Sequence, residues 1–338
     1  MRPLGLGHNM VSIVDVARHC GVTPSSVSRA LNNKAGVSES LRQKIKQACI
    51  ELNYAPNEVA RTLITKESKL IGLIIPDLVS TYYASIAKGV NEYLRSQGYN
   101  VLLCDCNRDE HIEKDNIQFL KRQRVEGIIM VSVTASESDI KAIKDSGIQV
   151  VAADVELSDS ISSVINDNYT GALQLFRHMI HQGCKNIGLI LGNKRSKTTI
   201  DRLRAFKQVM EENAIEFNEH NIIYTDATFE NGYKKTKGLL GKGIDSIFAI
   251  NDSVALGAIK YCQDHGIKIP DDIKVAGYDD LEISSMISVP LTTVHQRKIF
   301  LGKKAAELLL QEIENAQDPI KIVLTPKLVV RASLGEKQ

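Results

Sequence analysis

Residues 13–32 read IVDVARHCGVTPSSVSRALN, a pattern that predicts two short helices joined by a tight turn. Ser12 and Asp15 have the spacing of a capping box, which satisfies free amide groups at a helix start. Gly21 provides the permissive backbone that a sharp turn requires after the first helix. The first part of the chain is therefore expected to form a small helical unit.

The second predicted helix has two chemically different faces. Thr23 is suited to cap it, and Pro24 can occupy its first position, where the missing N–H costs nothing. Apolar residues recur at helical spacing and are expected to face inward: Val27, Ala30 and Leu31. Small polar side chains and one arginine remain as outward-facing candidates: Ser25, Ser26, Ser28 and Arg29. Such a surface suits the major groove of DNA, although an ordinary αα-hairpin is the alternative on this stretch alone.

A third helix is expected to follow, with Ser38 as its N-cap. Its basic side chains Arg42, Lys44 and Lys46 either reach DNA phosphates or form a solvated charged face. The first 68 residues carry nine Lys and Arg against five Asp and Glu, whereas the remaining 270 carry 33 against 35. A small basic head on a near-neutral body fits a polyanionic partner for the head.

From Lys69 onward, short apolar runs alternate with helical stretches. Eight runs are predicted to be strands: 71–75, 101–104, 127–131, 150–153, 187–191, 222–224, 247–250 and 273–277. Buried parallel strands joined by crossover helices produce this rhythm. The predicted fold class is therefore α/β, with an all-α head and a body of two doubly wound parallel-sheet lobes.

Polar residues stand at the carboxyl ends of several predicted strands, where ligands bind in such sheets. Asp154 follows the fourth run, Asn251 the seventh and Asp279 the eighth. For Asp77 and Asp252 we expect helix N-caps instead of ligand contacts. A cleft between the two lobes is the favoured place for a pocket.

Enzyme classes lack their sequence signatures in this chain. It has no phosphate-binding loop, no nucleophile-elbow motif, no dinucleotide-binding glycine motif after a strand and no metal-ligand spacing. We therefore expect no enzyme activity, no catalytic residue, no metal and no cofactor. Six cysteines without a C-x-x-C pair fit a reducing cytoplasm. No apolar run approaches the roughly 18 residues of a membrane span.

Several motifs occur in one order along the chain: Asp15-Val16-Ala17, Gly21-Val22-Thr23, 27–32, Tyr54-x-Pro56-Asn57-x-Val59-Ala60-Arg61-x-Leu63, 71–77, Asn251-Asp252, 277–280 and 291–296. Together they closely resemble the lactose/galactose repressor family of bacterial transcription regulators, and the combination is far more specific than any single motif. The resemblance implies a helix-turn-helix head, a hinge helix and a body like a periplasmic sugar-binding protein. It also implies a homodimer on a near-palindromic operator.

The expected domains are a leader or cloning remnant at 1–10, expected to be disordered, a helix-turn-helix domain at 11–57, a hinge helix and linker at 58–68, and an effector-binding and dimerisation body at 69–335. Within the body, the first lobe is expected at about 69–166 and 297–325 and the second at about 167–296 and 326–335. Residues 58–64 are too few for a helix that is stable alone, so we expect them to order only against a partner.

The resemblance implies this set of DNA-contacting residues: Thr23, Pro24, Ser25, Ser26, Ser28, Arg29, Asn32, Tyr54, Asn57, Arg61 and Leu63. Pro24 departs from the polar or aromatic residue of many relatives and cannot hydrogen-bond a base. Readout is therefore expected to depend on Ser25, Arg29 and apolar contact. Leu63 matches a leucine that wedges into the minor groove and bends the duplex.

The resemblance also implies an effector cleft lined by Tyr82, Tyr83, Asp154, Arg202, Asn251, Asp279 and Gln296. Two carboxylates, an arginine and an amide offer acceptors and donors that suit neighbouring sugar hydroxyls, and tyrosine faces suit the C–H side of a sugar ring. Because the two carboxylates repel a phosphate, we expect a neutral sugar or polyol. Ala205 replaces the glycine that is usual in the family near Arg202.

The expected function is a DNA-binding transcriptional repressor controlled by a small sugar. One alternative is a sugar-binding protein without a DNA role, and another is a regulator controlled by a protein coregulator. The first nine residues lack the apolar core of a signal peptide, which argues against a secreted sugar-binding protein. The expected partners are double-stranded operator DNA, the effector and a second copy of the chain, without a membrane. The expected location is the bacterial cytoplasm, with nucleoid association when the protein is bound to DNA.

Overall fold

The computed structural model describes residues 11–54, 67–131, 137–315 and 318–335. The chain divides into two compact units, residues 1–68 and 69–338, which are taken in turn below.

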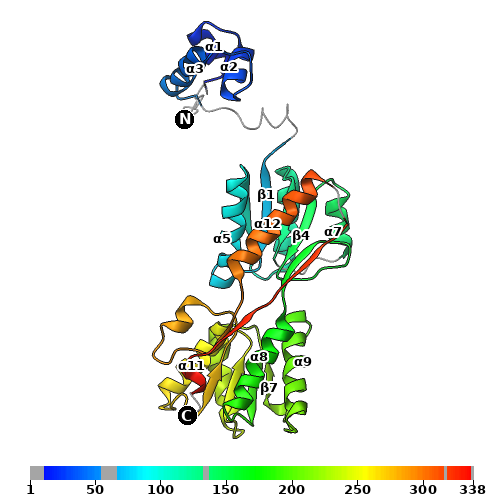
Figure 1. Ribbon diagram of the computed structural model, residues 1–338, viewed down its shortest axis with the longest axis vertical. Coiled ribbons are helices and arrows are strands. Elements are labelled where there is room, and N and C mark those ends of the chain that lie inside the picture. Colours follow the sequence, from blue (N-terminus) through cyan, green and yellow to red (C-terminus); the bar gives the residue numbers. More distant parts are fainter. Residues whose placement is uncertain (1–10, 55–66, 132–136, 316–317, 336–338) are drawn as a thin grey trace, which may run out of the picture. The chain divides into compact units, whose positions relative to one another are not determined.

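The first unit contains three helices, α1 (Ile13–Cys20), α2 (Pro24–Leu31) and α3 (Glu39–Glu51), which enclose a small core (Figure 1). Its buried members are Val16, Ala17, Cys20, Val27, Ala30, Ile45 and Ala48. The carboxylate of Asp15 accepts hydrogen bonds from the amide and the hydroxyl of Ser12, at 3.0 and 2.7 Å. Gly21 ends α1 with a φ of 72°, in the left-handed region that glycine adopts readily. The predicted helix, turn and helix are confirmed.

The first lobe of the second unit is a six-stranded parallel sheet in the order β11-β5-β4-β3-β1-β2. Its strands are β1 (Leu70–Ile75), β2 (Asn100–Asp105), β3 (Gly127–Met130), β4 (Gln149–Ala153), β5 (Ser163–Asn166) and β11 (Lys321–Leu324). Its helices are α5 (Thr81–Ser96), α6 (Glu110–Arg122), α7 (Glu137–Lys144) and α12 (Lys298–Glu314). Figure 1 shows α12 lying over this sheet beside α5.

The packing of α12 on α5 depends on two glycines. A Cβ atom at Gly89 would collide with the backbone of Ile299, and one at Gly302 would collide with the backbone of Ile86. The two helix backbones therefore touch directly, and α12 is held firmly in the first lobe.

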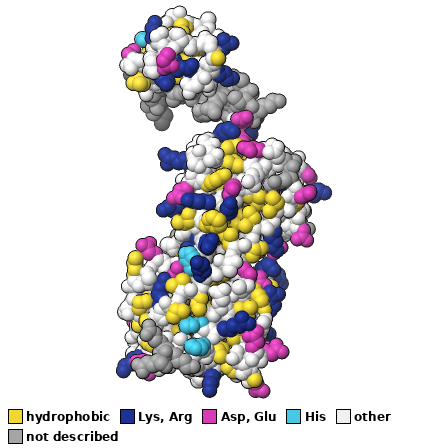
Figure 2. Space-filling model, in the orientation of Figure 1, with side chains coloured by type: hydrophobic (Ala, Val, Ile, Leu, Met, Phe, Trp, Pro, Cys, Tyr) yellow, Lys and Arg dark blue, Asp and Glu magenta, His cyan; other side chains and the backbone are white. Residues whose placement is uncertain are grey.

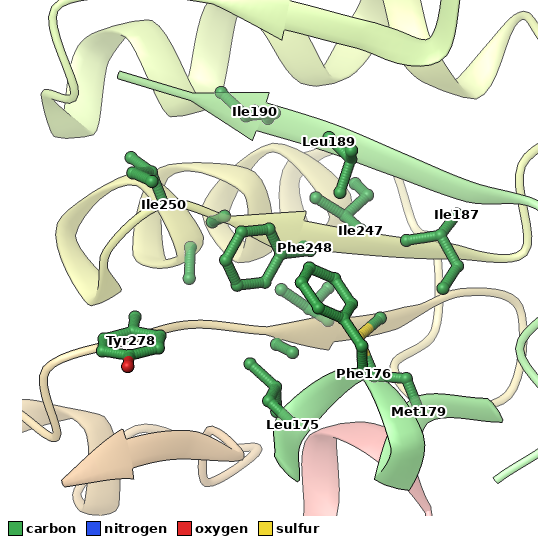
Figure 3. Packing of buried hydrophobic residues seen from close by; sticks show 14 of the residues in the cluster. Leu175, Phe176, Met179, Ile187, Leu189, Ile190, Ile247, Phe248, Ile250 and Tyr278 are labelled. Atoms are coloured by element: carbon green, nitrogen blue, oxygen red, sulfur yellow. The ribbon is translucent and has the colours of Figure 1, made fainter. Parts of the chain in front are cut away.

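The second lobe is a four-stranded parallel sheet in the order β7-β6-β8-β9. Its strands are β6 (Ile187–Leu191), β7 (Ile222–Tyr224), β8 (Ser246–Ala249) and β9 (Lys274–Ala276), and its helices are α8 (Asn168–His181), α9 (Lys197–Glu212), α10 (Phe229–Leu240) and α11 (Asp252–Asp264). Short 3₁₀ turns occupy Glu219–Asn221, Glu282–Ser285 and Ala332–Leu334. Aromatic and aliphatic side chains from α8 and the sheet fill its core, where Phe176 and Phe248 lie with ring centroids 4.7 Å apart (Figure 3).

The chain passes between the lobes after β5, after β10 (Thr293–His295) and after β11. β10 pairs antiparallel with β12 (Lys327–Val329) next to these connections. The apolar-run criterion does not detect β5, β10 and β11, because each includes polar residues such as Asn166, His295 and Lys321. The α/β class with two parallel-sheet lobes is confirmed.

The face of the body seen in Figure 2 is not dominated by one charge. Figure 2 shows Lys and Arg interspersed with Asp and Glu on the visible face of the body, with hydrophobic side chains between them on the first lobe. Within the described ranges, no helix has the length and apolar character needed to cross a membrane.

Candidate functional site

The N-terminal turn of α2 presents the polar surface expected from the sequence. Thr23 caps the helix by accepting a hydrogen bond from the Ser26 amide at 3.3 Å, and Pro24 is the first helical residue. Pro24, Ser25 and Arg29 are exposed, and Ser26 and Ser28 are half-buried. The outward face of α2 therefore carries hydroxyls and one guanidinium, which can donate hydrogen bonds to base edges and to phosphates.

Two further predicted DNA contacts lie at the edges of the head. Asn32 is exposed and donates from its side-chain amide to the carbonyl of Ser28 at 2.8 Å, so it closes the end of α2. Tyr54 is half-buried and packs against the head core. The predicted contacts Asn57, Arg61 and Leu63, like the hinge at 58–64, lie outside the described residues.

Two basic side chains of α3 have structural partners. Arg42 donates to the carbonyl of Ala30 at 2.7 Å and to the side chain of Asn33 at 3.0 Å, and it also reaches the carbonyl of Lys34. Lys44 donates to the carbonyl of Cys20 at 3.1 Å. They satisfy carbonyls at the ends of α2 and α1, which a helix leaves without intrahelical partners. Lys44 and Lys46 remain exposed, whereas Arg42 is half-buried.

A cavity of about 860 Å³ lies between the two lobes, at the carboxyl ends of both sheets. It is lined by all of the predicted effector residues: Tyr82, Tyr83, Asp154, Arg202, Asn251, Asp279 and Gln296. The structure therefore brings together seven residues that span more than 200 positions of the sequence. A site at this place is the arrangement expected for doubly wound sheets.

A hydrogen-bonded chain of side chains crosses the cavity from lobe to lobe. The Tyr82 hydroxyl lies 2.8 Å from Oδ1 of Asp154 and 3.2 Å from Oε1 of Gln296. The side-chain amide of Gln296 in turn donates to Oδ1 of Asp279 at 2.6 Å. Asn166, at the end of β5, donates to the carboxylate of Asp154 at 3.1 Å. Carboxylates of both lobes are thus oriented through one glutamine on the connecting segment.

Arg202 is buried and anchored on several sides. Its guanidinium donates to the side-chain oxygen of Asn168 at 2.7 and 3.1 Å and to the carbonyl of Ile250. It lies 3.4 Å from the ring centroid of Tyr278, a member of the second-lobe core (Figure 3), and 4.0 Å from the carboxylate of Asp279. These contacts fix the direction of a strong donor within the cavity wall.

Burial dominates the electrostatics of the site. It raises the pKa of Asp279 to about 8, and it raises the pKa of Asp154 from its ordinary value. It also raises the pKa of Tyr83 to about 12 and lifts the pKa of Tyr82 well above its ordinary value. At neutral pH the two tyrosines therefore keep their protons, and much of the Asp279 carboxyl is protonated.

Two aspartates at strand ends do not act as the N-caps predicted for them. Asn251 is the N-cap of α11, accepting from the amide of Val254 at 2.9 Å, while Asp252 is the first helical residue. The buried carboxylate of Asp252 accepts from Thr293 and Ser284, at 2.6 and 2.7 Å, and so ties α11 to the neighbouring segments. Asp77 accepts from the amide of Val79 in a local turn, and Ser80 precedes α5.

Sequence patterns did not identify several other residues of the cavity wall. Asn168, which orients Arg202, follows a strand that the apolar-run criterion misses. Arg108, on the loop after β2, and Thr199, in the first turn of α9, also line the cavity. Only the position of Asn168 after Asn166 and Asp167 resembles the polar strand ends used for prediction. Among the described residues, no cluster of three His, Cys, Asp or Glu side chains is suited to hold a metal ion.

Two family models match the chain. The model described as bacterial regulatory proteins of the lacI family matches residues 12–57. The model described as periplasmic binding proteins and sugar binding domain of the LacI family matches residues 68–332.

Individual proteins resemble the chain over nearly its whole length. A ribose operon repressor from Halalkalibacterium halodurans is 37% identical over 95% of this chain and 96% of its own. The structure of the lac repressor dimer bound to operator and the anti-inducer ONPF matches 96% of this chain and 99% of its own, with 29% identity and a TM-score of 0.86. A LacI family transcriptional regulator from Enterococcus faecalis with bound ribose matches 80% of this chain and 100% of its own, with 26% identity and a TM-score of 0.73.

Proposed function

Because the chain belongs to the lacI family of bacterial regulatory proteins, we propose that it is a transcriptional repressor whose binding to operator DNA is controlled by a sugar held between the two lobes. The observation that carries the proposal is the cavity, in which residues of both lobes are joined through Gln296. A ligand that bonds to both walls favours one relative position of the lobes, which is the requirement for control by an effector.

The DNA partner is assigned to the head. We assign base-edge contacts to Ser25 and Arg29, whose side chains are exposed on α2, and contacts with the sugar-phosphate backbone to Ser26 and Ser28. We also assign operator contacts to the hinge residues Arg61 and Leu63, on the family resemblance alone. Since the lac repressor relative is a dimer on its operator, two copies of this chain are expected on a near-palindromic site.

The effector is assigned to the class of neutral sugars, with ribose as the first candidate. Arg202, Gln296 and Asp154 offer a cationic donor, an amide and a carboxylate, a mixture that matches vicinal hydroxyls. Tyr83 adds an aromatic surface for the ring. The ribose operon repressor and the ribose-bound regulator from Enterococcus faecalis support this choice. We place the protein in the bacterial cytoplasm, at the nucleoid when it is bound to operator.

Thermal unfolding of the full chain in a panel of pentoses, hexoses and polyols tests the effector class. Ribose is expected to raise the Tm, because a ligand that binds only the folded state stabilises it by mass action. Asp154→Asn is expected to lose the shift. Asp264→Asn, which changes an exposed carboxylate on α11 away from the cavity, should keep it. Ribose 5-phosphate serves as the charged comparison, and a larger shift with it than with any neutral sugar would contradict the assigned class.

A further inference from the structure

Lys298 occupies a position that is unfavourable for its own helix. It is the first residue of α12, it follows Arg297 at the N-cap, and the first turn has no acidic residue. The amino end of a helix carries a partial positive charge, so cations there are repelled. Lys298 is also half-buried, and burial lowers the pKa of its ammonium group. Helix stability therefore does not explain a lysine here.

The ammonium group of Lys298 reaches into the other lobe. It donates to the backbone carbonyl of Asp280 at 3.0 Å and to the backbone carbonyl of Asp279. Asp279 and Asp280 follow β9 of the second lobe, whereas α12 is fixed to α5 of the first lobe. A single side chain therefore connects a first-lobe helix to the backbone of an effector-site residue.

That backbone has an unusual conformation. Asp279 has a φ of 113° and Asp280 a φ of 52°, both in the region that side-chain-bearing residues rarely adopt. Such conformations persist only where the surroundings hold them, and they gather at functional sites. The Asp279 amide donates to the carbonyl of Val294 at 3.0 Å, and the Asp280 amide donates to the hydroxyl of Thr293 at 3.2 Å. Lys298 adds hydrogen bonds to the carbonyls of the same two residues.

The side chain of Asp280 is held separately. Its carboxylate accepts from Arg331 at 2.6 Å and lies 2.8 Å from Nδ1 of His295. The carboxylate of Asp280, its own carbonyl and the carbonyl of Asp279 are all hydrogen-bonded. Asp280 therefore cannot rotate independently of the segments that connect the lobes. The direction of the preceding Asp279 side chain is consequently set by the same group of contacts.

We propose that Lys298 is a positioning residue for the effector site: it holds the left-handed backbone of Asp279 and Asp280 so that the Asp279 carboxyl faces Gln296 and Arg202, and it ties the first lobe to that carboxyl. The inference rests on the proposed function insofar as the Asp279 carboxyl contacts the effector. Lys298 itself does not line the cavity, so it acts through Asp279.

The charged and titratable groups around Asp279 determine how the loss of Lys298 changes the pKa of the Asp279 carboxyl. They come from every element packed there: Arg202 of α9, Asp252 of α11, Asp154 after β4, Tyr82 and Tyr83 of α5, Tyr278 after β9 and Lys298 of α12. Burial raises the pKa of Asp279, and the positive charges of Arg202 and Lys298 oppose that rise. Loss of the Lys298 charge therefore has a defined sign: the pKa of Asp279 moves further up.

The test compares Lys298→Met, which keeps an unbranched apolar stem, with Lys298→Arg, which keeps a charged donor. Lys303→Met is the matched control, because Lys303 lies on the same helix and forms a surface ion pair with Glu92, at 3.1 Å. Ribose affinity by calorimetry is expected to fall about tenfold or more in Lys298→Met, in line with the loss of a charged hydrogen-bond donor that orients a ligand contact. It should recover to within about threefold of wild type in Lys298→Arg. Lys298→Gln, which retains a neutral donor, replaces the methionine variant if that variant does not fold.

A second readout does not need a sugar. The pKa of the Asp279 carboxyl, followed by carbon NMR and assigned with Asp279→Asn, should rise in Lys298→Met and stay at the wild-type value in Lys303→Met. An unchanged Asp279 pKa together with unchanged ribose affinity in Lys298→Met would overturn the inference. If no sugar binds wild-type protein, the proposed function fails, and the NMR result still decides the role of Lys298.

Discussion

The side-chain amide of Gln296 donates a hydrogen bond of 2.6 Å to the carboxyl of Asp279, while its oxygen lies 3.2 Å from the Tyr82 hydroxyl. Gln296 is buried on a segment that connects the lobes, so it contacts the polar groups of both at once. Movement of one lobe relative to the other must change at least one of these two hydrogen bonds. The hydrogen bond between Gln296 and Asp279 therefore links ligand binding in the cavity to the relative position of the lobes.

Gln296→Leu is expected to weaken sugar binding without unfolding the body. The substitution leaves the buried Asp279 carboxyl without this donor, and a buried acceptor left without its partner costs about 1–3 kcal/mol. Sugar affinity measured by calorimetry should therefore fall by about one to two orders of magnitude. Operator affinity in the absence of sugar should stay at the wild-type value. A sugar affinity within about twofold of wild type would remove Gln296 from the site.

Asp279→Asn is expected to stabilise the protein increasingly as the pH rises. Burial raises the pKa of Asp279 from 3.8 to about 8, so the folded state holds a proton that the unfolded state releases between these values. Folding stability contributed by this group falls as pH rises through that window, and asparagine removes the dependence. The gain over wild type should be near zero at about pH 4 and reach a few kcal/mol at about pH 8.

Urea unfolding of both proteins at several pH values measures this gain. Asp226→Asn is the control, because Asp226 is an exposed carboxylate that lines the same cavity. A stability difference between Asp279→Asn and wild type that does not change with pH would show that Asp279 titrates normally.

Arg202→Met is expected to abolish the sugar response and to lower the Tm at the same time. The guanidinium of Arg202 lines the cavity and also donates hydrogen bonds to the side chain of Asn168 and to the carbonyl of Ile250. Its loss therefore leaves buried acceptors without a donor. Such a loss costs about 1–3 kcal/mol of stability. Calorimetric scanning with and without sugar records both effects. A variant that still shifts with sugar at the wild-type concentration would mean that Arg202 has a structural role alone.

Arg29→Ala is expected to reduce specific operator binding by about 1–3 kcal/mol, because a bidentate arginine contact discriminates one base from the others. Affinity for random DNA should change much less. Anisotropy titrations on operator and on scrambled DNA of the same length make the comparison. Equal losses on both would reassign Arg29 to a phosphate contact.

Arg42→Met is expected to destabilise the head, because Arg42 satisfies carbonyls at the end of α2 and in the following loop. The expected cost is about 1–3 kcal/mol, the range for leaving partly buried acceptors unpaired. Lys46→Met, an exposed change on the same helix, is the control and should leave the head Tm unchanged. Hydrogen exchange of the α2 amides locates the effect. Equal exchange in the two variants would contradict the role given to Arg42.

The sequence predicts features that depend on neighbours along the chain. The Ser12–Asp15 pair, the Gly21 turn and the Thr23 cap are local, and each occurs in the structure. The apolar runs predict eight strands for the same reason. β5 and β11 escape detection because polar residues such as Ser163, Asn166 and Lys321 interrupt their apolar runs, and their pairing with each other joins segments more than 150 residues apart.

The site was predictable only as far as family motifs extend. Tyr82, Arg202 and Asp279 lie in the cavity as expected, but their partners come from tertiary structure. The role of Asn168 in orienting Arg202, or of Lys298 in holding Asp279, leaves no trace in local composition or spacing. The same reason explains Arg42, whose acceptors belong to another helix and loop.

The central claim is that sugar binding in the cavity changes the affinity of the head for operator DNA. Its most direct test is an anisotropy titration of a labelled near-palindromic operator, selected from random DNA with the purified protein, in the presence and absence of ribose. The account predicts a change in operator affinity of about fivefold or more in wild type and none in Arg202→Met, since allosteric coupling is typically 1–3 kcal/mol. Linkage requires that operator change ribose affinity by the same factor. Tight operator binding that no sugar of the panel alters would contradict the account.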